Sequence, residues 1–287
     1  MTKQKRTVRK FLILTAIVSL ALMGLSANPA FSTSWSSSNV SANATRSTNS
    51  SIAVDKSGTI HVVWEEEDRE IYYRKSSDGG TSWSAIANVS RSASGSRLPK
   101  IAVAPDGSLS VVWVELTTNW EIFYSQFKSN TWSTPVNVSS TSFTMSDYPR
   151  LAIDAGGKIH VAWQDNNEVA YSSSNDGQTW LKPNVILTSG GEVIEPPALS
   201  AAGNNVHLVW GQQHLSGEPP VVYFDIRYRM YNGSTGIWGP TTIIAPGSTT
   251  YRGYPAVASD TGGKPHAIWV EGSTLRYTTR ASKEHPG

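Results

Sequence analysis

The sequence has no cysteine among its 287 residues, which excludes disulfide bonds, thiol catalysis and zinc sites built on thiolates. It also has no apolar stretch as long as the roughly 20 residues that a membrane-spanning helix needs. The longest such stretch, Phe11 to Leu25, is 15 residues long. The fold must therefore be stabilised by its core alone, and the roughly 250 residues that follow are enough to form one.

The apolar stretch at the N-terminus has the features of an export signal. Five basic residues precede it and small residues follow it. This order is typical of a secretory signal peptide, with cleavage expected after Ala27 or Ala30. An uncleaved membrane anchor is the alternative, disfavoured because the stretch is short and lacks a second basic flank. We therefore predict a signal peptide over 1–30 and a secreted or extracytoplasmic protein, with no membrane span once the signal is removed.

The positive charge of the whole chain comes from this same segment. The 24 basic and 22 acidic residues give a net charge of +2, but the first 30 residues hold five of the basic residues and no acidic one. The remaining chain therefore has a net charge of −3. It lacks the basic surface that nucleic acids require, so we predict no nucleic-acid partner.

Ten of the eleven tryptophans recur at a nearly fixed spacing. The first tryptophan series, with steps of 49, 50, 47 and 59 residues, is Trp64, Trp113, Trp163, Trp210 and Trp269. The second tryptophan series, with steps of 48, 49, 48 and 58 residues, is Trp35, Trp83, Trp132, Trp180 and Trp238. A fixed period of this length indicates a repeat architecture.

Each repeat has the pattern of two hairpins. The first is a short apolar run, a turn rich in Gly, Asp and Asn, and an alternating run that ends at the first-series tryptophan, as in residues 51–64. The second begins with an acidic residue, an aliphatic residue and a tyrosine, as in Glu121 to Tyr124, and leads to the second-series tryptophan and a fourth strand. Four strands in about 50 residues match the blade of a β-propeller.

The repeats predict an all-β fold over residues 31–281, a five-bladed β-propeller with four-stranded blades, followed by a C-terminal tail over 282–287. The last repeat ends after three strands. Residues 35–41, WSSSNVS, match the fourth-strand segments WSAIANVS and WSTPVNVS. We therefore expect this N-terminal strand to complete the last blade and close the ring, which also protects the sheet edges.

The turns before the second-series tryptophans carry the pattern S-x-D-x-G-x-x-W. Ser76 to Trp83 fits it, and Ser173 to Trp180 fits it with Asn175 in place of the aspartate. In such a turn the Asp or Asn accepts backbone N–H groups, Gly takes a positive φ and Trp packs the hairpin onto its blade. The pattern resembles the Asp-box, or BNR, repeat of sialidase-like propellers. The resemblance implies that this turn lies away from the active face.

Strand direction places the inter-blade loops and the turns between second and third strands on one face, where propeller sites usually lie. On this face an acid or amide follows each first-series tryptophan by two positions: Glu66, Glu115, Asp165, Gln212 and Glu271. Two such carboxylates could hydrolyse a glycosidic bond. We favour a structural role, because a catalytic group needs one position and not five.

Four histidines also share one repeat position, three residues before the tryptophan: His61, His160, His207 and His266. Equivalent positions of separate blades lie far apart, so a shared metal is disfavoured. We expect hydrogen-bonded histidines within the blades, and we predict neither a metal site nor a cofactor.

Residues that differ between repeats near the channel are better candidates for a site. Arg97-Leu98-Pro99 is similar to the Arg-Ile-Pro segment of sialidases, which supplies one of three arginines for the substrate carboxylate. The resemblance implies Arg150 and Arg252 as the other two, since guanidinium groups bind carboxylates through two parallel hydrogen bonds. It further implies Tyr254 as nucleophile with Glu195 as its partner. Asp147 is a further catalytic candidate, and Tyr148 a further ligand-binding one.

The sialidase-like set has an alternative explanation, and the sequence also offers candidate residues outside it. Proline recurs at the position of Pro99 in four repeats, so the Arg-Leu-Pro segment can also follow from the repeat, with the charges merely solvated. The loop 211–224 is longer than its equivalents and carries His214 and Glu218, and Trp120 belongs to neither series. Long loops and exposed tryptophans often bind ligands, with tolerated insertion and packing as the alternatives.

Three functions are compatible with these residues. The first is a monomeric extracellular module that binds a glycan or a protein at the channel, because the catalytic set is incomplete. The alternative is a glycoside hydrolase of exo-sialidase type. The third is a surface protein with a purely structural role.

Overall fold

The computed structural model describes residues 37–43, 45–141, 144–182, 184–185, 191–193 and 195–280. The predicted signal peptide, Trp35 and the tail over 282–287 lie outside these residues. The chain divides into two compact units, 1–38 and 39–287, and every strand belongs to the second. The described residues contain no helix, and so none that is long and apolar enough to cross a membrane.

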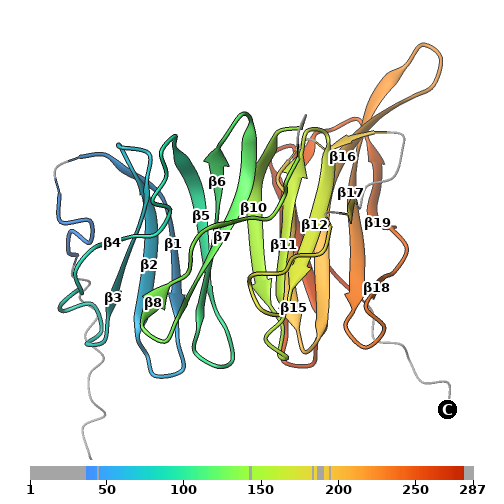
Figure 1. The fold of residues 1–287 in the computed structure, drawn as a ribbon. Coiled ribbons are helices and arrows are strands. Elements are labelled where there is room, and N and C mark those ends of the chain that lie inside the picture. The colour runs from blue at the N-terminus through green and yellow to red at the C-terminus, as the bar shows by residue number, and fades with distance from the viewer. Residues whose placement is uncertain are drawn as a thin grey trace, which may run out of the picture. The chain divides into compact units, whose positions relative to one another are not determined.

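Five antiparallel sheets follow one another along the chain (Figure 1). The first sheet is β1 (Ser47–Val54), β2 (Ile60–Glu66), β3 (Ile71–Ser76) and β4 (Ala87–Asn88). The second is β5 (Ser96–Val103), β6 (Leu109–Leu116) and β7 (Trp120–Lys128), with β8 (Thr131–Trp132) and β9 (Val136–Asn137) both paired to β7. The third is β10 (Ser146–Ile153), β11 (Ile159–Asp165), β12 (Glu168–Ser174) and β13 (Asn184–Val185).

The last two sheets depart from this pattern. In the fourth, β14 (Glu192–Val193) and β15 (Ala198–Ala202) pair with β16 (Asn205–Ser216), which pairs with β17 (Val221–Asn232); β18 (Ile237–Trp238) and β19 (Thr242–Ser248) pair with β17. The fifth has only β20 (Arg252–Ser259), β21 (Pro265–Glu271) and β22 (Thr274–Thr279). The predicted all-β fold of repeated antiparallel sheets is thus confirmed, with one sheet for each repeat.

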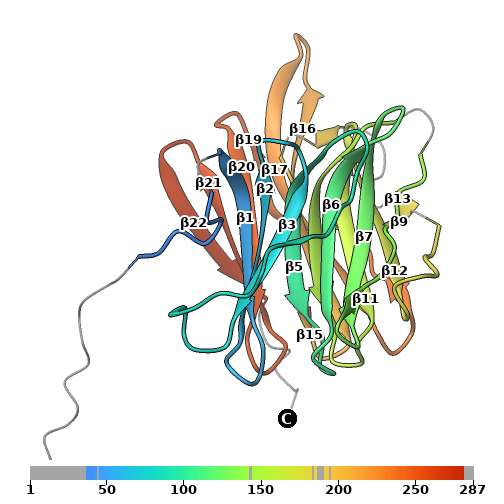
Figure 2. The same cartoon turned by 60° about the vertical axis from the view of Figure 1, so that its left-hand side comes forward.

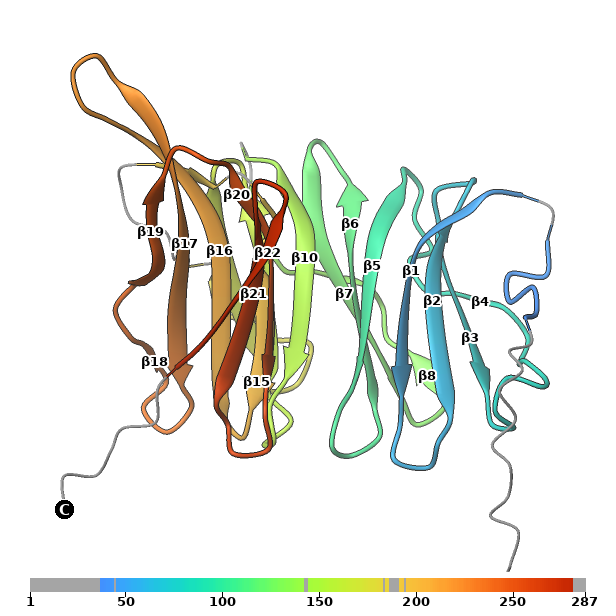
Figure 3. The same cartoon turned by 180° about the vertical axis from the view of Figure 1, so that it is seen from behind.

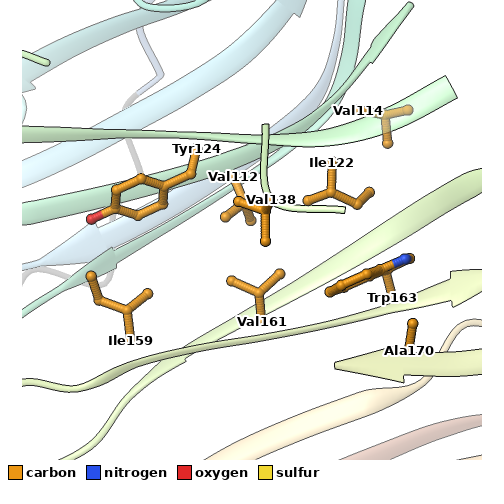
Figure 4. Packing of buried hydrophobic residues seen from close by; sticks show 9 residues of the cluster. All are labelled: Val112, Val114, Ile122, Tyr124, Val138, Ile159, Val161, Trp163 and Ala170. Atoms are coloured by element: carbon orange, nitrogen blue, oxygen red, sulfur yellow. The ribbon is translucent and has the colours of Figure 1, made fainter. Parts of the chain in front are cut away.

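The core lies between consecutive sheets, where the apolar face of one meets the next. Figure 4 shows the contact between the second and third sheets, with Ile122 and Tyr124 facing Val161 and Trp163. Trp163 is fully buried, and Trp113 and Trp210 hold the same place in the contacts before and after. In the second to fifth sheets the first-series tryptophans therefore recur because each fills the space against the preceding sheet, where a large aromatic ring buries most area.

The repeated carboxylates and histidines have internal partners. Glu66 and Glu115 each accept a hydrogen bond at 2.7 Å from the Nε1 of the tryptophan two residues before. His160 lies between the Tyr171 hydroxyl, 2.7 Å from its Nδ1, and Asp154, 3.3 Å from its Nε2. His61 and His266 make the same two contacts in their own sheets. These contacts agree with a structural role for Glu66, Glu115 and the three histidines, whereas Asp165 Oδ1 and the side-chain amide of Gln212 are buried with no hydrogen-bond partner among the described residues.

The Asp-box turns are held by the carboxylate, with one correction to the expected alignment. Asp78 accepts hydrogen bonds from Ser76 Oγ at 2.7 Å and from the backbone N–H of Ser82 at 2.9 Å. In the third sheet these roles belong to Ser174 and Asp176, at 2.9 Å, and not to Asn175. The turn has shifted by one residue, because an aspartate is available there to accept the N–H groups.

The expected completion of the last sheet by the N-terminal segment is not confirmed. The fifth sheet consists of β20, β21 and β22 (Figure 2), and residues 37–41 form no strand. Within the second unit, the carbonyl of Val40 accepts a hydrogen bond from Arg74 of the first sheet at 2.7 Å. The described residues thus give five consecutive sheets without the additional strand that would complete the fifth.

Candidate functional site

The candidate site lies at one end of the sheets, where the first strand of each sheet begins. We call these strands, β1, β5, β10, β14 with β15, and β20, the innermost strands. We call this end the mouth. Four of the innermost strands shift register there by a β-bulge, between Thr48 and Ser51, Arg97 and Lys100, Asp147 and Arg150, and Gly253 and Ala256. The residue at the centre of each bulge has a positive φ: Asn49, Leu98, Tyr148 and Tyr254. Such backbone is disfavoured for side chains of this size, and bulges of this kind often re-aim side chains beside binding sites.

One cluster of predicted residues assembles where the second and third sheets meet at the mouth. Arg97 forms an ion pair with Asp147 at 2.6 Å, across the boundary between the two sheets. Its guanidinium carbon also lies 4.0 Å from the ring centre of Trp120, a cation–π contact. Burial raises the pKa of the Asp147 carboxyl, and the backbone N–H of Tyr148 and the Arg97 charge oppose that effect. Tyr148 itself remains exposed.

Two further cations lie just below this cluster on the innermost strands. Lys100 of β5 and Arg150 of β10 stand at the same repeat position. Lys100 is paired with Val112, which packs toward the third sheet, so Lys100 lies on the face that looks toward β10. Arg150 is paired with Ala162, which packs toward the fourth sheet, so the two cations flank β10 from either side. Burial lowers the pKa of both groups, and the nearby Arg150 charge lowers that of Lys100 further.

These two cations have no carboxylate partner in the described part of the chain. No Asp or Glu there lies within 4.0 Å of either one. The hydrogen bond found for Arg150 goes to a neutral acceptor, the carbonyl of Pro149, at 3.1 Å. Two partly buried cations without a counter-charge favour an anion between or above them, because their repulsion is offset by opposite charge.

Glu195 pairs with a tyrosine other than the expected one. The hydroxyl of Tyr251 donates a hydrogen bond to Glu195, joining the segment between β14 and β15 to the segment before β20. Burial and this contact with Glu195 raise the pKa of Tyr251. Tyr254 lies beside it, with ring centres 6.2 Å apart, and is 66% exposed. The bulge at Tyr254 turns its side chain outward, which leaves Tyr251 as the neighbour of Glu195.

The three predicted arginines have three different environments. Arg97 is tied to Asp147, and Arg252 to Glu271 through two hydrogen bonds of 2.9 and 2.6 Å. Glu271 also accepts a hydrogen bond from Arg276 at 2.7 Å, and these contacts lower its pKa, with Arg252 the larger cause. Arg150 alone of the three has no carboxylate beside it in the described residues. The structure thus shows no common partner for the three guanidinium groups.

The long loop 211–224 forms most of a hairpin between β16 and β17 that extends past the other turns (Figure 3). His214 stacks on Tyr223, with ring centres 5.8 Å apart, and its Nδ1 lies 3.4 Å from Asp225. Glu218 is exposed near the tip. Leu215 and Val222, which face each other across the hairpin, are also exposed. His214 therefore supports the base of the hairpin, and Glu218 faces solvent.

Two residues of this region were not predicted from the sequence. Lys100 could have been found, because it shares a repeat position with Arg150 and differs from Ser51 at the same place. Tyr251 carried no such signal, since it lies in an inter-blade loop whose course only the fold defines. Across the described residues, no group of three or more His, Asp or Glu side chains is arranged to hold a metal ion.

Solved structures with the same fold include carbohydrate-active enzymes. A protein of unknown function from Dyadobacter fermentans is 15% identical, with a TM-score of 0.57 over 80% of this chain and 74% of that one. An ulvan lyase of a new polysaccharide lyase family is 12% identical, with a TM-score of 0.58 over 83% and 73%. An α-L-arabinofuranosidase from Fusarium graminearum is 14% identical, with a TM-score of 0.53 over 80% of each chain.

A search of curated proteins finds no match to this sequence. A model of the BNR repeat-containing family, in contrast, matches residues 26–271, which include the first four repeats and the first two strands of the fifth. This match confirms the resemblance drawn from the Asp-box turns. The chain is a member of the BNR repeat-containing family.

Proposed function

We propose that the protein is an exported carbohydrate-binding propeller whose ligand is an acidic glycan, bound at the mouth beside β10. The observation that carries this proposal is the pair Lys100 and Arg150, two partly buried cations with no carboxylate within 4.0 Å among the described residues. A uronate or sulfate group supplies the negative charge that these side chains lack.

The surroundings of this pair suit a sugar chain. Arg97, Asp147 and the exposed Tyr148 lie on the mouth side of the two cations and offer hydrogen-bond donors, acceptors and an aromatic ring. One face of Trp120 is covered by Arg97, so we assign its indole to packing and not to direct stacking on sugar. A carboxylate on the ligand would be held by charge-assisted hydrogen bonds, which are shorter and stronger than neutral ones.

The solved structures support the same class of ligand. One structure of the ulvan lyase holds -[GlcA(1-4)Rha3S]-, and the arabinofuranosidase was solved with an iminosugar inhibitor. Both likenesses are at the level of the fold, so the acidic character of the ligand is argued from Lys100 and Arg150 alone. Export follows from the predicted signal peptide over 1–30.

The test is a binding measurement on the chain without residues 1–30, with polygalacturonate and alginate as acidic glycans and arabinan as a neutral one. We expect saturable binding to at least one polyuronate, weakened by salt because the contact is ionic. Lys100→Ala with Arg150→Ala should weaken it about tenfold or more, the loss of roughly one charge-assisted contact.

Lys56→Ala is the control, since it removes one positive charge from the β1–β2 turn at the opposite end of the sheets, where Lys56 donates a hydrogen bond to the carbonyl of Pro105. It should bind as the wild type does. Equal binding of arabinan and polyuronate, or binding unaffected by the double substitution, would contradict the proposal.

A glycoside hydrolase of exo-sialidase type is the second candidate, favoured by the hydrogen bond between Tyr251 and Glu195. In such a reaction Glu195 would accept the phenol proton while the Tyr251 oxygen attacks the anomeric carbon and the glycosidic bond breaks, the departing alcohol taking its proton from solvent. Water would then hydrolyse the bond between Tyr251 and the sugar, and Tyr251 would recover its proton from Glu195. The raised pKa keeps Tyr251 protonated at neutral pH, so the transfer of its proton to Glu195 is required. The ion pairs that Arg97 and Arg252 form with carboxylates of the protein weigh against the hydrolase, because, of the three arginines, they leave Arg150 for a substrate carboxylate.

A fluorogenic sialoside separates the two candidates. Turnover that falls at least a hundredfold in Tyr251→Phe, and little in Tyr254→Phe, would establish the hydrolase. Absence of turnover in the wild type, with polyuronate binding intact, leaves the binding function as the answer.

A further inference from the structure

Three of the contacts between neighbouring sheets contain the same pair of aromatic rings. In each, a second-series tryptophan meets edge-on the tyrosine of the preceding sheet's third strand. The pairs are Trp132 on Tyr73 at 5.2 Å and 76°, Trp180 on Tyr124 at 5.0 Å and 66°, and Trp238 on Tyr171 at 4.9 Å and 86°. This T-shaped geometry is a preferred one for aromatic rings, and its recurrence makes it a property of the repeat.

The contact between the fourth and fifth sheets has the tyrosine but a different neighbour. Tyr228 holds the repeat position of the other three, and its hydroxyl lies 2.8 Å from Nδ1 of His207, just as Tyr73 lies 2.8 Å from His61. The fifth repeat, however, ends after Tyr277 without a tryptophan of the second series. Against Tyr228 lies a cavity of about 340 Å³.

The walls of this cavity are mainly apolar and come from both sheets. Met230 and Ile244 line it from the fourth sheet, and Val257 and Ala267 from the fifth. Thr279 and Arg280 add polar atoms at the end of β22. The cavity lies toward the start of β21 and the end of β22, away from the mouth, so it is separate from the site proposed for glycans.

One small side chain widens the space. Ala267 stands where the other sheets have Val62, Val111, Val161 and Leu208. Each of the last three packs toward the preceding sheet in its own contact. With alanine at this position, the fifth sheet leaves room beside Tyr228 for a planar bicyclic ring, and a cavity of this volume lies within the range of small-molecule sites.

We propose that this cavity is a binding site for an indole ring, held edge-on against Tyr228 as the second-series tryptophans are held against the equivalent tyrosines. The apolar walls cover the faces of the ring. The indole N–H is directed to the polar rim at Thr279, because a buried N–H needs an acceptor.

The experiment titrates the full chain with 5-fluoroindole and follows the fluorine resonance by NMR. We expect saturable binding by the full chain, or by Trp35→Ala where Trp35 already fills the site, with a dissociation constant on the order of 1 mM or lower, reasonable for nine ring atoms in an apolar site. The substitutions that follow are made in whichever of the two proteins binds. Ala267→Leu should fill the cavity and weaken binding at least tenfold, while its melting temperature stays at or above that of the wild type. Ile268→Ala, the adjacent exposed residue on the opposite face, should bind as the wild type does.

A parallel titration of Trp35→Ala identifies the source of the indole. Trp35 lies outside the described residues, and the sequence of the segment that it begins, 35–41, matches that of the segment that begins at Trp132. Binding only in this variant shows a site filled from within the chain, and binding in both proteins shows a site for an external indole. Both results support the proposal. Failure of Trp35→Ala to bind the probe, or equal binding by Ala267→Leu, overturns it, whatever the outcome of the glycan measurements.

Discussion

Residues at the same repeat position are buried in the first four sheets and exposed to solvent in the fifth. The aliphatic residue two positions before the third-strand tyrosine is fully buried in four sheets and 68% exposed in the fifth; the five residues are Ile71, Ile122, Val169, Ile226 and Leu275. The third-strand tyrosines show the same contrast, since Tyr124 of the second sheet is fully buried and Tyr277 of the fifth is 60% exposed. The difference lies in the following sheet, which covers this face for the first four.

The first sheet shows the complementary difference on its other face. Ile52 of β1 is 65% exposed, whereas Ile101, at the same position of β5, is 8% exposed because it packs on the first sheet. Each contact in this fold therefore joins two unlike faces. An apolar pattern in the sequence marks a face that can be covered, and the neighbouring sheet decides whether it is.

The largest expected effect separates a covered tyrosine from an uncovered one. Tyr124→Ala should lower the free energy of unfolding by about 3 to 5 kcal/mol, the range for a large aromatic removed from a core. Tyr277→Ala, at the same repeat position, should cost less than about 1 kcal/mol, because its ring has little packing to lose. Urea unfolding followed by circular dichroism measures both. Similar losses in the two variants would show that the comparison does not hold in solution.

The second effect depends on pH and on the burial of His160. Burial lowers the pKa of His160 to about 4, with Asp154 opposing the effect. The unfolded chain binds this proton near pH 6.5, so the neutral histidine stabilises the fold above that pH and the stabilisation is lost as the pH falls toward 4. Between pH 7 and pH 5 the loss from His160 should be roughly 2 kcal/mol.

A substitution that the chain itself suggests provides the control. In the second sheet Ser110 stands at the histidine position, and its hydroxyl lies 2.9 Å from that of Tyr124. His160→Ser should therefore keep a hydrogen bond to Tyr171 and reduce the pH dependence between 7 and 5. An unchanged slope would assign the acid sensitivity to other groups, such as His61 and His207, whose pKa values burial also lowers.

The third effect compares ion pairs between and within sheets. Asp147→Asn leaves Arg97 without its partner at the boundary of two sheets, where both side chains are partly buried, and should cost about 1 kcal/mol. Asp106→Asn breaks the exposed pair with Lys128, at 3.1 Å within the second sheet, and should cost less than about 0.5 kcal/mol. Unfolding in low salt and in 0.5 M NaCl distinguishes them, because only the exposed pair should be fully screened. Equal costs would mean that the boundary position has no influence.

The sequence predicted the elements that depend on local pattern. The two tryptophan series predicted the five sheets, since in the second to fifth sheets the first-series ring fills the same space against the preceding sheet. The site was predicted only in part. Arg97 and Asp147 stand at the same position of neighbouring repeats, and they form an ion pair between neighbouring sheets. The pairing of Glu195 with Tyr251, in contrast, depends on how a bulge turns Tyr254 outward. A shift of one residue in a bulge or a turn, as at Asp176, leaves the pattern unchanged and alters the contacts.

The smallest expected effect is also the sharpest test of the comparison. Leu275→Ser should change the free energy of unfolding by less than about 0.5 kcal/mol, since the leucine is 68% exposed and little apolar area is lost. Ile226→Ser, at the same position of the fourth sheet, should cost about 3 kcal/mol or more, because it removes a fully buried side chain and buries a hydroxyl. Urea unfolding of both variants, with Tyr277→Ala for reference, gives the difference directly. A cost for Leu275→Ser close to that of Ile226→Ser would mean that the outer face of the fifth sheet is covered in solution, and the exposed faces of the first and fifth sheets would then be the surfaces to examine.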